Sequence, residues 1–421
     1  MLQRAQTIIT ILKNYKKVIE NYFFMTLLFI LNSLFGLLLY PLVIGALGKD
    51  SYGTYVFVMS VVQYFITFVS FGFDSLGVRE ISLNINNVRK KSKAFSAIFT
   101  SKLYLELVSL LVFMTLIATI PVLRAEFTIY LIAFLGTVAN ILLPSWYFQA
   151  IQKMRVITYV QVVIKMLSIV LIWRYVKVPS DLTLFTFIMT SSTVAGAAIA
   201  FVYLLKQEKL RVKIVSVARV KQYIMKARYF FYTSVGVVVK LQTLNIITGL
   251  YFSMADLAIY DLAYKVIMIP MAILVSINGA LFPKIMIDFN LQAVKKILTI
   301  ESAIAIIACL ITILLSPYVI ALLGKGQMED AFPLVVIMSF SLYGFLLAGC
   351  YCSLILVPMG LDKYILNNQI VAMVSVFVVL FLGLLITDNI LTLAVSFTLS
   401  SVAEVFYLRY IIQKKVNVKI L

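Results

Sequence analysis

The 421-residue sequence contains no histidine and only three cysteines, and both shortages narrow the chemistry open to it. Without histidine the chain lacks the commonest metal ligand and the usual general base of enzymes. Cys309, Cys350 and Cys352 all fall within apolar runs, where cysteine behaves as a small buried hydrophobe. We therefore expect no metal site, no disulfide and no catalytic centre built from these residue types.

Charged residues are scarce as well, at 13% of the chain, whereas hydrophobic residues make up 63%. Average soluble domains hold about 25% charged and about 45–50% apolar residues. A water-soluble core cannot absorb this excess, so most of the chain is predicted to lie in lipid. The first 21 residues are basic and polar and include no short apolar core with a cleavage site, so we expect no secretory signal peptide.

Long apolar runs predict membrane-spanning helices, because about 20 residues at 1.5 Å each are needed to cross about 30 Å of hydrocarbon. Twelve runs can be distinguished, at residues 22–44, 54–78, 95–119, 127–149, 156–175, 182–205, 229–252, 257–281, 297–320, 331–356, 366–386 and 389–412. We therefore predict an all-α integral membrane protein with an N-terminal six-helix lobe (1–205), a basic linker (206–228) and a C-terminal six-helix lobe (229–421).

Basic residues gather on one side of these spans, which sets their orientation. The two termini and the even-numbered loops carry most of the 36 basic residues, so both termini are predicted to be cytoplasmic. The opposite side holds only Lys49, Arg124, Arg174, Lys177 and Lys325. Topology thus explains the net charge of +19, and the dispersed basic residues form no single patch for nucleic acid. The linker is expected to be a short helix on anionic headgroups, with a regulatory or partner-binding role as the alternative.

The two halves of the sequence resemble each other at an offset of 205 residues, as an internal repeat would. Tyr52–Tyr55 opens the second span and Leu257–Tyr260 opens the eighth, while Arg79 and Lys284 lie at the inner ends of the same two spans. Six plus six spans give both halves the same orientation, as in transporters built from parallel repeats. Such a pair of bundles predicts a central cavity and alternating access.

Four short motifs stand at equivalent ends of the spans. They are the turn Leu47–Tyr55 (LGKDSYGTY), Pro144–Met154 (PSWYFQAIQKM), Ala280–Ile285 (ALFPKI) and Leu315–Gly324 (LSPYVIALLG). Together they resemble the polysaccharide transporter family, the Wzx-type O-antigen flippases, of the multidrug/oligosaccharidyl-lipid/polysaccharide exporter superfamily. The resemblance extends over essentially the whole chain, with Ala150 and Ala258 replacing glycines that are usual there.

This resemblance implies a MATE-like fold and a defined cargo. The expected function is to flip undecaprenyl-pyrophosphate-linked oligosaccharide repeats from the cytoplasmic to the periplasmic leaflet of the bacterial inner membrane, for surface polysaccharide and O-antigen biosynthesis. Lipid-linked oligosaccharide, membrane lipids and polysaccharide-assembly proteins are the implied partners. No cofactor is implied, and coupling to a H⁺ or Na⁺ gradient is left open.

Two other functions remain as alternatives. One is a multidrug exporter, or an exporter of another lipid-linked substrate, from the same superfamily. The other is a membrane enzyme of polysaccharide assembly. The short loops and the lack of histidine speak against an enzyme. Lysines within the spans fit an anionic lipid better than a cationic drug.

Four lysines lie within predicted spans, where a charge costs about 2.5–3.5 kcal/mol unless it faces protein or water. They are Lys102, Lys165, Lys240 and Lys265. Lys102 stands four residues before Glu106, and Lys265 stands four residues after Asp261, so each pair shares one helix face. A local ion pair is therefore the simplest interpretation of both.

Lys165 and Lys240 have no carboxylate in their own spans. Two hypotheses apply to Lys240. It either lines a cavity and binds cargo phosphate, or it pairs with Glu404 or Asp74 from another span.

The residues above supply two sets of candidates. The candidates for cargo binding are Lys240, Lys165, Lys265, Arg79 and Lys284, the last two with snorkelling to headgroups as the alternative. The candidates for ion coupling are Asp74, Asp261, Glu404 and Glu106, each with a structural ion pair as the alternative.

Overall fold

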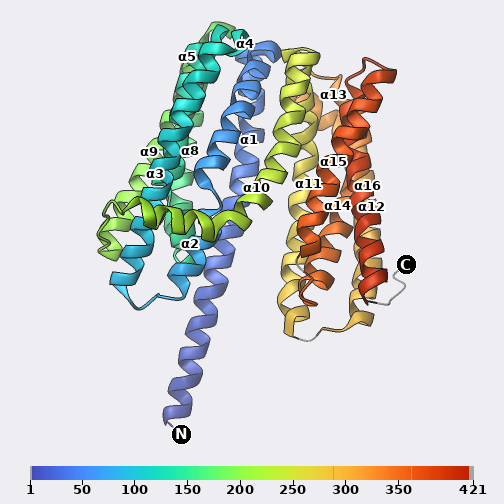
Figure 1. The fold of residues 1–421 in the computed structure, drawn as a ribbon. Helices are drawn as coiled ribbons and strands as arrows, with labels where there is room; N and C mark the ends of the chain where they lie inside the picture. Colours follow the sequence, from blue (N-terminus) through green and yellow to red (C-terminus); the bar gives the residue numbers. More distant parts are fainter. Residues whose placement is uncertain (1, 288, 362, 417–421) are drawn as a thin grey trace. The chain divides into compact units, whose positions relative to one another are not determined.

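The computed structural model (Figure 1) describes the backbone of residues 2–287, 289–361 and 363–416. It describes the side chains in these ranges except those of residues 2–19, 22, 29, 33, 275, 276, 279, 280, 282–284, 286, 287 and 416. The described backbone forms helices and no strand, which confirms the all-α prediction. Eleven helices in this part of the chain are long and apolar enough to cross a membrane, so the chain is a multi-pass membrane protein.

The chain divides into two compact units, each of which is a bundle of helices. The N-terminal unit comprises Met1–Leu39 and Val61–Val235, and the C-terminal unit comprises Tyr40–Ser60 and Gly236–Leu421. The C-terminal unit therefore includes a segment from the first half of the chain. The division into lobes at 1–205 and 229–421 stays a prediction.

The first helix holds two of the twelve predicted spans. Helix α1 runs from Leu2 to Ser70, and the apolar stretch Phe23–Ser82 is 60 residues long, which is far more than one crossing needs. Gly48 interrupts the helix between the two spans with φ 72° and ψ 173°. Glycine adopts this left-handed φ without steric cost, so the break falls in the LGKDSYGTY turn.

The other helices of the N-terminal unit follow the predicted spans closely. They are α2 (Phe73–Ser82), α3 (Val88–Thr119), α4 (Pro121–Ala125), α5 (Phe127–Leu135), α6 (Thr137–Leu142), α7 (Ser145–Ala150), α8 (Met154–Tyr175), the short 3₁₀ helix η1 (Pro179–Asp181) and α9 (Leu182–Glu208). The predicted span 127–149 is divided into α5, α6 and α7 by two breaks, one at Gly136 and one at Leu143 and Pro144. The second break arises because Pro144 lacks the N–H that would continue the helix. Its last piece, α7, places Trp146, Tyr147 and Phe148 in the core of the unit, where Trp146 and Tyr147 pack against Phe95 of α3.

Helix α10 (Val217–Tyr251) begins in the N-terminal unit and continues into the C-terminal unit from Gly236. The remaining helices are α11 (Met254–Ile287), α12 (Leu291–Gly324), α13 (Ala331–Ser339), α14 (Ser341–Cys350), the π-helix η2 (Tyr351–Leu356), α15 (Lys363–Ile386) and α16 (Leu391–Val416). Helices α5 and α13 are each nine residues long and are each followed by a break. This shared interruption supports the internal repeat inferred from the sequence.

Gly53 marks a close approach between α1 and α11 within the C-terminal unit. A Cβ atom at this position would lie 1.7 Å from the carbonyl oxygen of Met254. Because backbone atoms cannot yield as a flexible side chain can, we expect Gly53→Ala to destabilise the protein by about 1–3 kcal/mol. Thermal unfolding of the detergent-purified protein measures this effect. Gly36→Ala is the matched control, since a Cβ there meets nothing within 4 Å, and equal melting temperatures for the two variants would contradict the prediction.

Candidate functional site

Asp261 on α11 is the centre of a buried polar cluster in the C-terminal unit. Its Oδ2 atom accepts hydrogen bonds from the hydroxyls of Tyr40 and Tyr52, at 3.1 and 3.0 Å. The ammonium of Lys265 lies 2.7 Å from the same oxygen and 2.6 Å from the Tyr52 hydroxyl. It also lies over the Tyr40 and Tyr52 rings, 5.0 and 5.3 Å from their centroids. The predicted Asp261–Lys265 pair is therefore present, and two tyrosines from α1 complete it.

Lys240 on α10 pairs with Glu404 on α16. The ammonium lies 3.0 Å from Glu404 Oε1, and the amide of Asn368 on α15 donates to Oε2 at 3.0 Å. Lys240 also lies 5.7 Å from the ring centroid of Phe397. Both charged side chains are largely buried, at 16% and 14% exposed. The structure thus shows one of the two arrangements considered for Lys240, the ion pair with Glu404. The pair is physically reasonable because a counterion lowers the free-energy cost of a charge within a membrane.

A cavity of about 520 Å³ adjoins this pair within the C-terminal unit. Its polar lining consists of Asn278, Cys352, Ser353, Asn368, Gln369 and Glu404. The side-chain oxygens of Asn278 and Asn368 are buried and accept no hydrogen bond from the described residues. Such oxygens can accept from water or from a hydroxyl-bearing ligand, or they can coordinate a cation. The cavity therefore suits a small polar ligand beside the Glu404 carboxylate.

The N-terminal unit has an ion pair of its own, between a buried lysine and a partly exposed carboxylate, and it differs from the prediction. The Lys102 ammonium on α3 lies 2.9 Å from Asp74 Oδ1 on α2, and it donates to the carbonyl of Asn140 on α6 at 3.1 Å. Glu106 instead accepts a hydrogen bond from the hydroxyl of Thr137. The predicted Lys102–Glu106 pair is therefore wrong. Helices α2 and α6 pack against α3 and offer each charged group a nearer partner.

Lys165 on α8 is a half-buried cation with an aromatic neighbour. Its ammonium lies 4.1 Å from the ring centroid of Phe35 on α1. Among the residues that the structure describes, no carboxylate pairs with Lys165. A ring face attracts a cation but supplies no negative charge, so Lys165 is left without a counterion among the described residues.

A family model decides the relationship of this chain to known proteins. The model of the family described as "Polysaccharide biosynthesis protein" matches residues 18–287, which is more than half of the chain. The chain belongs to this polysaccharide biosynthesis family.

Individual relatives agree with this family. The Escherichia coli (strain K12) protein named "Putative O-antigen transporter" is 22% identical over 273 residues, which is 65% of this chain and 66% of that protein. The match thus spans just under two thirds of the relative. The structure of a protein named "Lipid II flippase MurJ, inward closed conformation" superposes with a TM-score of 0.73 at 12% identity, covering 93% of this chain and 87% of that one. An inward-facing multidrug resistance MATE family transporter gives a TM-score of 0.68 at 12% identity, covering 91% of this chain and 96% of that one. These likenesses confirm the predicted MATE-like fold.

Within the C-terminal unit of this family member, four of the candidate residues form two separate pairs. Asp261 and Lys265 form one cluster of the C-terminal unit, and Lys240 and Glu404 form another. In the N-terminal unit, Asp74, Glu106 and Lys165 have the separate environments described above, while Arg79 is exposed on α2. The side chain of Lys284 lies outside the described residues.

Sequence reasoning missed four residues that hold the candidates in place. They are Tyr40, Tyr52, Asn368 and Phe35. Tyr52 belongs to the LGKDSYGTY turn, so its motif could have drawn attention to it. Tyr40, Phe35 and Asn368 are aromatic and amide residues of kinds that occur many times in the chain, and no local sequence pattern distinguishes them.

Proposed function

We propose that this chain flips undecaprenyl-pyrophosphate-linked oligosaccharide repeat units from the cytoplasmic to the periplasmic leaflet of the bacterial inner membrane. The observation that carries this proposal is the family match over residues 18–287, joined by a relative named as an O-antigen transporter. The protein acts as a transporter and not as an enzyme. Cytoplasmic termini, a central cleft between the lobes and alternating access are parts of the same proposal, supported by the charge bias and the repeat.

The cargo pyrophosphate needs cations inside the membrane, and Lys165 is the best-suited residue. A charge-assisted hydrogen bond to phosphate is about twice as strong as a neutral one. The Lys165 ammonium has no carboxylate partner among the described residues, so cargo phosphate need not displace one.

Lys240 and Lys265 have a different role in the proposal, because each already pairs with a carboxylate. We propose that cargo phosphate displaces Glu404 or Asp261 from its lysine during transport. The released carboxylate then takes up H⁺ or Na⁺, which couples cargo movement to an ion gradient. Asp74 and Glu106 are the corresponding candidates of the N-terminal unit.

A substitution of Lys165 tests the cargo-binding role. In a strain that lacks the chromosomal copy, Lys165→Ala is expected to lower surface polysaccharide by about 10-fold or more, because losing one charge-assisted contact of about 1.5–3 kcal/mol has that effect. Lys165→Arg should keep part of the activity. Carbohydrate-stained gels measure the polysaccharide, and membrane immunoblots confirm equal protein levels.

The same strain separates a failure at Lys165 from a failure of the whole proposal. Normal polysaccharide in the Lys165→Ala strain would remove this residue from the cargo path and leave the flippase assignment standing. If the deletion strain itself accumulates no lipid-linked oligosaccharide but becomes sensitive to cationic dyes, the flippase assignment is wrong and the multidrug exporter alternative replaces it.

A further inference from the structure

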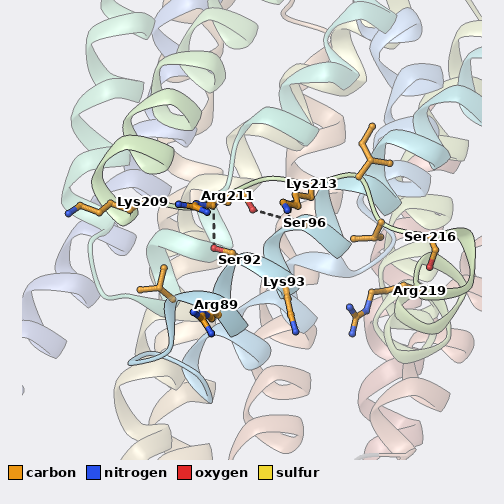
Figure 2. A pocket seen from close by; sticks show the side chains of 12 residues that line it. Arg89, Ser92, Lys93, Ser96, Lys209, Arg211, Lys213, Ser216 and Arg219 are labelled. Carbon is orange, nitrogen blue, oxygen red and sulfur yellow. Dashed lines mark hydrogen bonds between the residues drawn. The ribbon is translucent and has the colours of Figure 1, made fainter.

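A basic hollow of about 640 Å³ lies in the N-terminal unit (Figure 2). Six basic side chains line it. They are Arg89 and Lys93 of α3, Lys209, Arg211 and Lys213 of the segment after α9, and Arg219 of α10. Residues 210–216 are not helical, so the predicted surface helix of the linker is wrong at this point. We call residues 209–216 the basic strap.

The sequence of the basic strap explains how it presents its charges. Basic and apolar residues alternate from Lys209 to Ile214, which in an extended chain places them on opposite faces. Leu210 is buried in the core of the unit, and Val212 and Val215 pack against that core. Leu210, Val212 and Val215 therefore anchor the basic strap, whereas its basic side chains and Ile214 line the hollow.

A ladder of hydroxyl groups fixes the basic strap along α3. Ser96 Oγ donates to the carbonyl of Arg211 at 3.2 Å and accepts from the Lys213 amide at 3.1 Å. Further along, Thr100 Oγ1 accepts from the Val215 amide at 3.3 Å. The ladder is possible because four helical residues rise about 6 Å, which nearly equals the rise of about 6.6 Å over two extended residues. The backbone of the basic strap is thus held in place before any ligand arrives.

The charges of the hollow are not neutralised by the protein. Among the described residues, none of the six basic side chains makes an ion pair. The neighbouring carboxylate of Glu208 is already held by Lys91 and Lys153, at 2.8 and 2.9 Å. Helix α3 also begins with basic residues and has no acid in its first turn, which is unfavourable next to the positive end of a helix dipole. An anionic ligand would offset both the repulsion among the unpaired basic side chains and the unfavourable charge at the start of α3.

Exposed apolar side chains show which anion fits. Ile214 and Val88 line the hollow at 78% and 47% exposed, and Val217 beside it is 66% exposed. A soluble phosphate gains nothing from these side chains, whereas the acyl chains of a lipid bury them. We propose that the hollow is a binding site for an anionic membrane lipid whose headgroup carries two phosphates, with acyl chains against Ile214 and Val88.

The test measures lipid binding by the full-length protein in phosphatidylcholine nanodiscs at about 0.15 M salt, with fluorescent cardiolipin as the probe. The double variant Arg211→Gln/Lys213→Gln should weaken cardiolipin binding about 10- to 30-fold, because each basic residue near an anionic headgroup contributes about 1 kcal/mol. Ile214→Ser should also weaken it. Both variants alter exposed side chains, and an unchanged melting temperature confirms that they fold.

The matched control is Lys206→Gln/Lys221→Gln, which removes two exposed charges that do not line the hollow. It should bind cardiolipin within about two-fold of wild type. Equal losses in the two double variants would overturn the proposal in favour of diffuse attraction to the membrane. If inorganic pyrophosphate displaces cardiolipin, the ligand is a soluble phosphate and the lipid proposal is wrong. Unchanged cardiolipin binding by Ile214→Ser would also contradict the lipid proposal. Because none of these measurements involves oligosaccharide, failure here leaves the proposed flippase function untouched.

Discussion

Replacing Lys240 with alanine is expected to lower the free energy of unfolding by about 3–5 kcal/mol, because Glu404 would remain largely buried without its counterion. Asn368 would still donate one hydrogen bond to the carboxylate but would bring no charge. The melting temperature of the detergent-purified protein measures the loss. Lys363→Ala removes an exposed lysine of the same unit and should leave the melting temperature close to wild type.

The double variant Lys240→Met/Glu404→Gln separates structural pairing from cargo binding. Replacing both members of a buried pair by neutral groups is often close to neutral for stability, so we expect most of the lost stability to return. If Lys240 also binds cargo phosphate, surface polysaccharide should stay low in this variant, while Lys240→Arg keeps part of it. Full recovery of polysaccharide together with stability would assign Lys240 a structural role only. Failure to recover stability would contradict the pair itself.

Replacing Asp261 with alanine is the second substitution with a large expected effect. It removes the acceptor shared by Tyr40, Tyr52 and Lys265, and it leaves the Lys265 ammonium without its carboxylate. We expect a loss of about 3–5 kcal/mol in the free energy of unfolding. Tyr52→Phe removes a single hydroxyl and should cost only about 0.5–1.5 kcal/mol. Thermal unfolding of both variants gives the comparison.

Asp50→Ala is the control for the change of charge, because Asp50 is an exposed acid of the same unit. Asp261→Asn keeps an acceptor oxygen but removes the negative charge, so it should fall between wild type and Asp261→Ala. Identical melting temperatures for Asp261→Ala and Asp50→Ala would show that the cluster contributes nothing to stability.

Much of the fold could be predicted from the sequence, because lipid places a simple demand on the chain. Every crossing needs about 20 apolar residues in a helix, and this length is visible in the sequence. The one discrepancy in number arises because the first two predicted spans lie in one apolar stretch, Phe23–Ser82, which Gly48 interrupts and which continues past the end of α1 into α2. Of the two breaks within the span 127–149, the one at Pro144 could also be anticipated, since proline cannot continue the helical hydrogen bonds.

The candidate site was predictable only where partners lie on one helix. Asp261 and Lys265 are four residues apart, and helical geometry alone brings them together. The same rule failed for Lys102 and Glu106. Lys102 pairs with Asp74 from α2, and Glu106 accepts a hydrogen bond from Thr137 of α6. Spacing along a helix thus permits a pair but does not choose it.

By itself the sequence determined the membrane class, the helical architecture, the family motifs and the residues that could carry charge within lipid. Each of these follows from local composition or from spacing along one helix. Only the tertiary structure decided that Lys240 pairs with Glu404, 164 residues away, and that Tyr40 reaches Asp261 across 221 residues. It also aligned the basic strap with the hydroxyl ladder of α3. Packing brings such distant segments together, and the geometry of packing is a property of the folded chain that no local pattern contains.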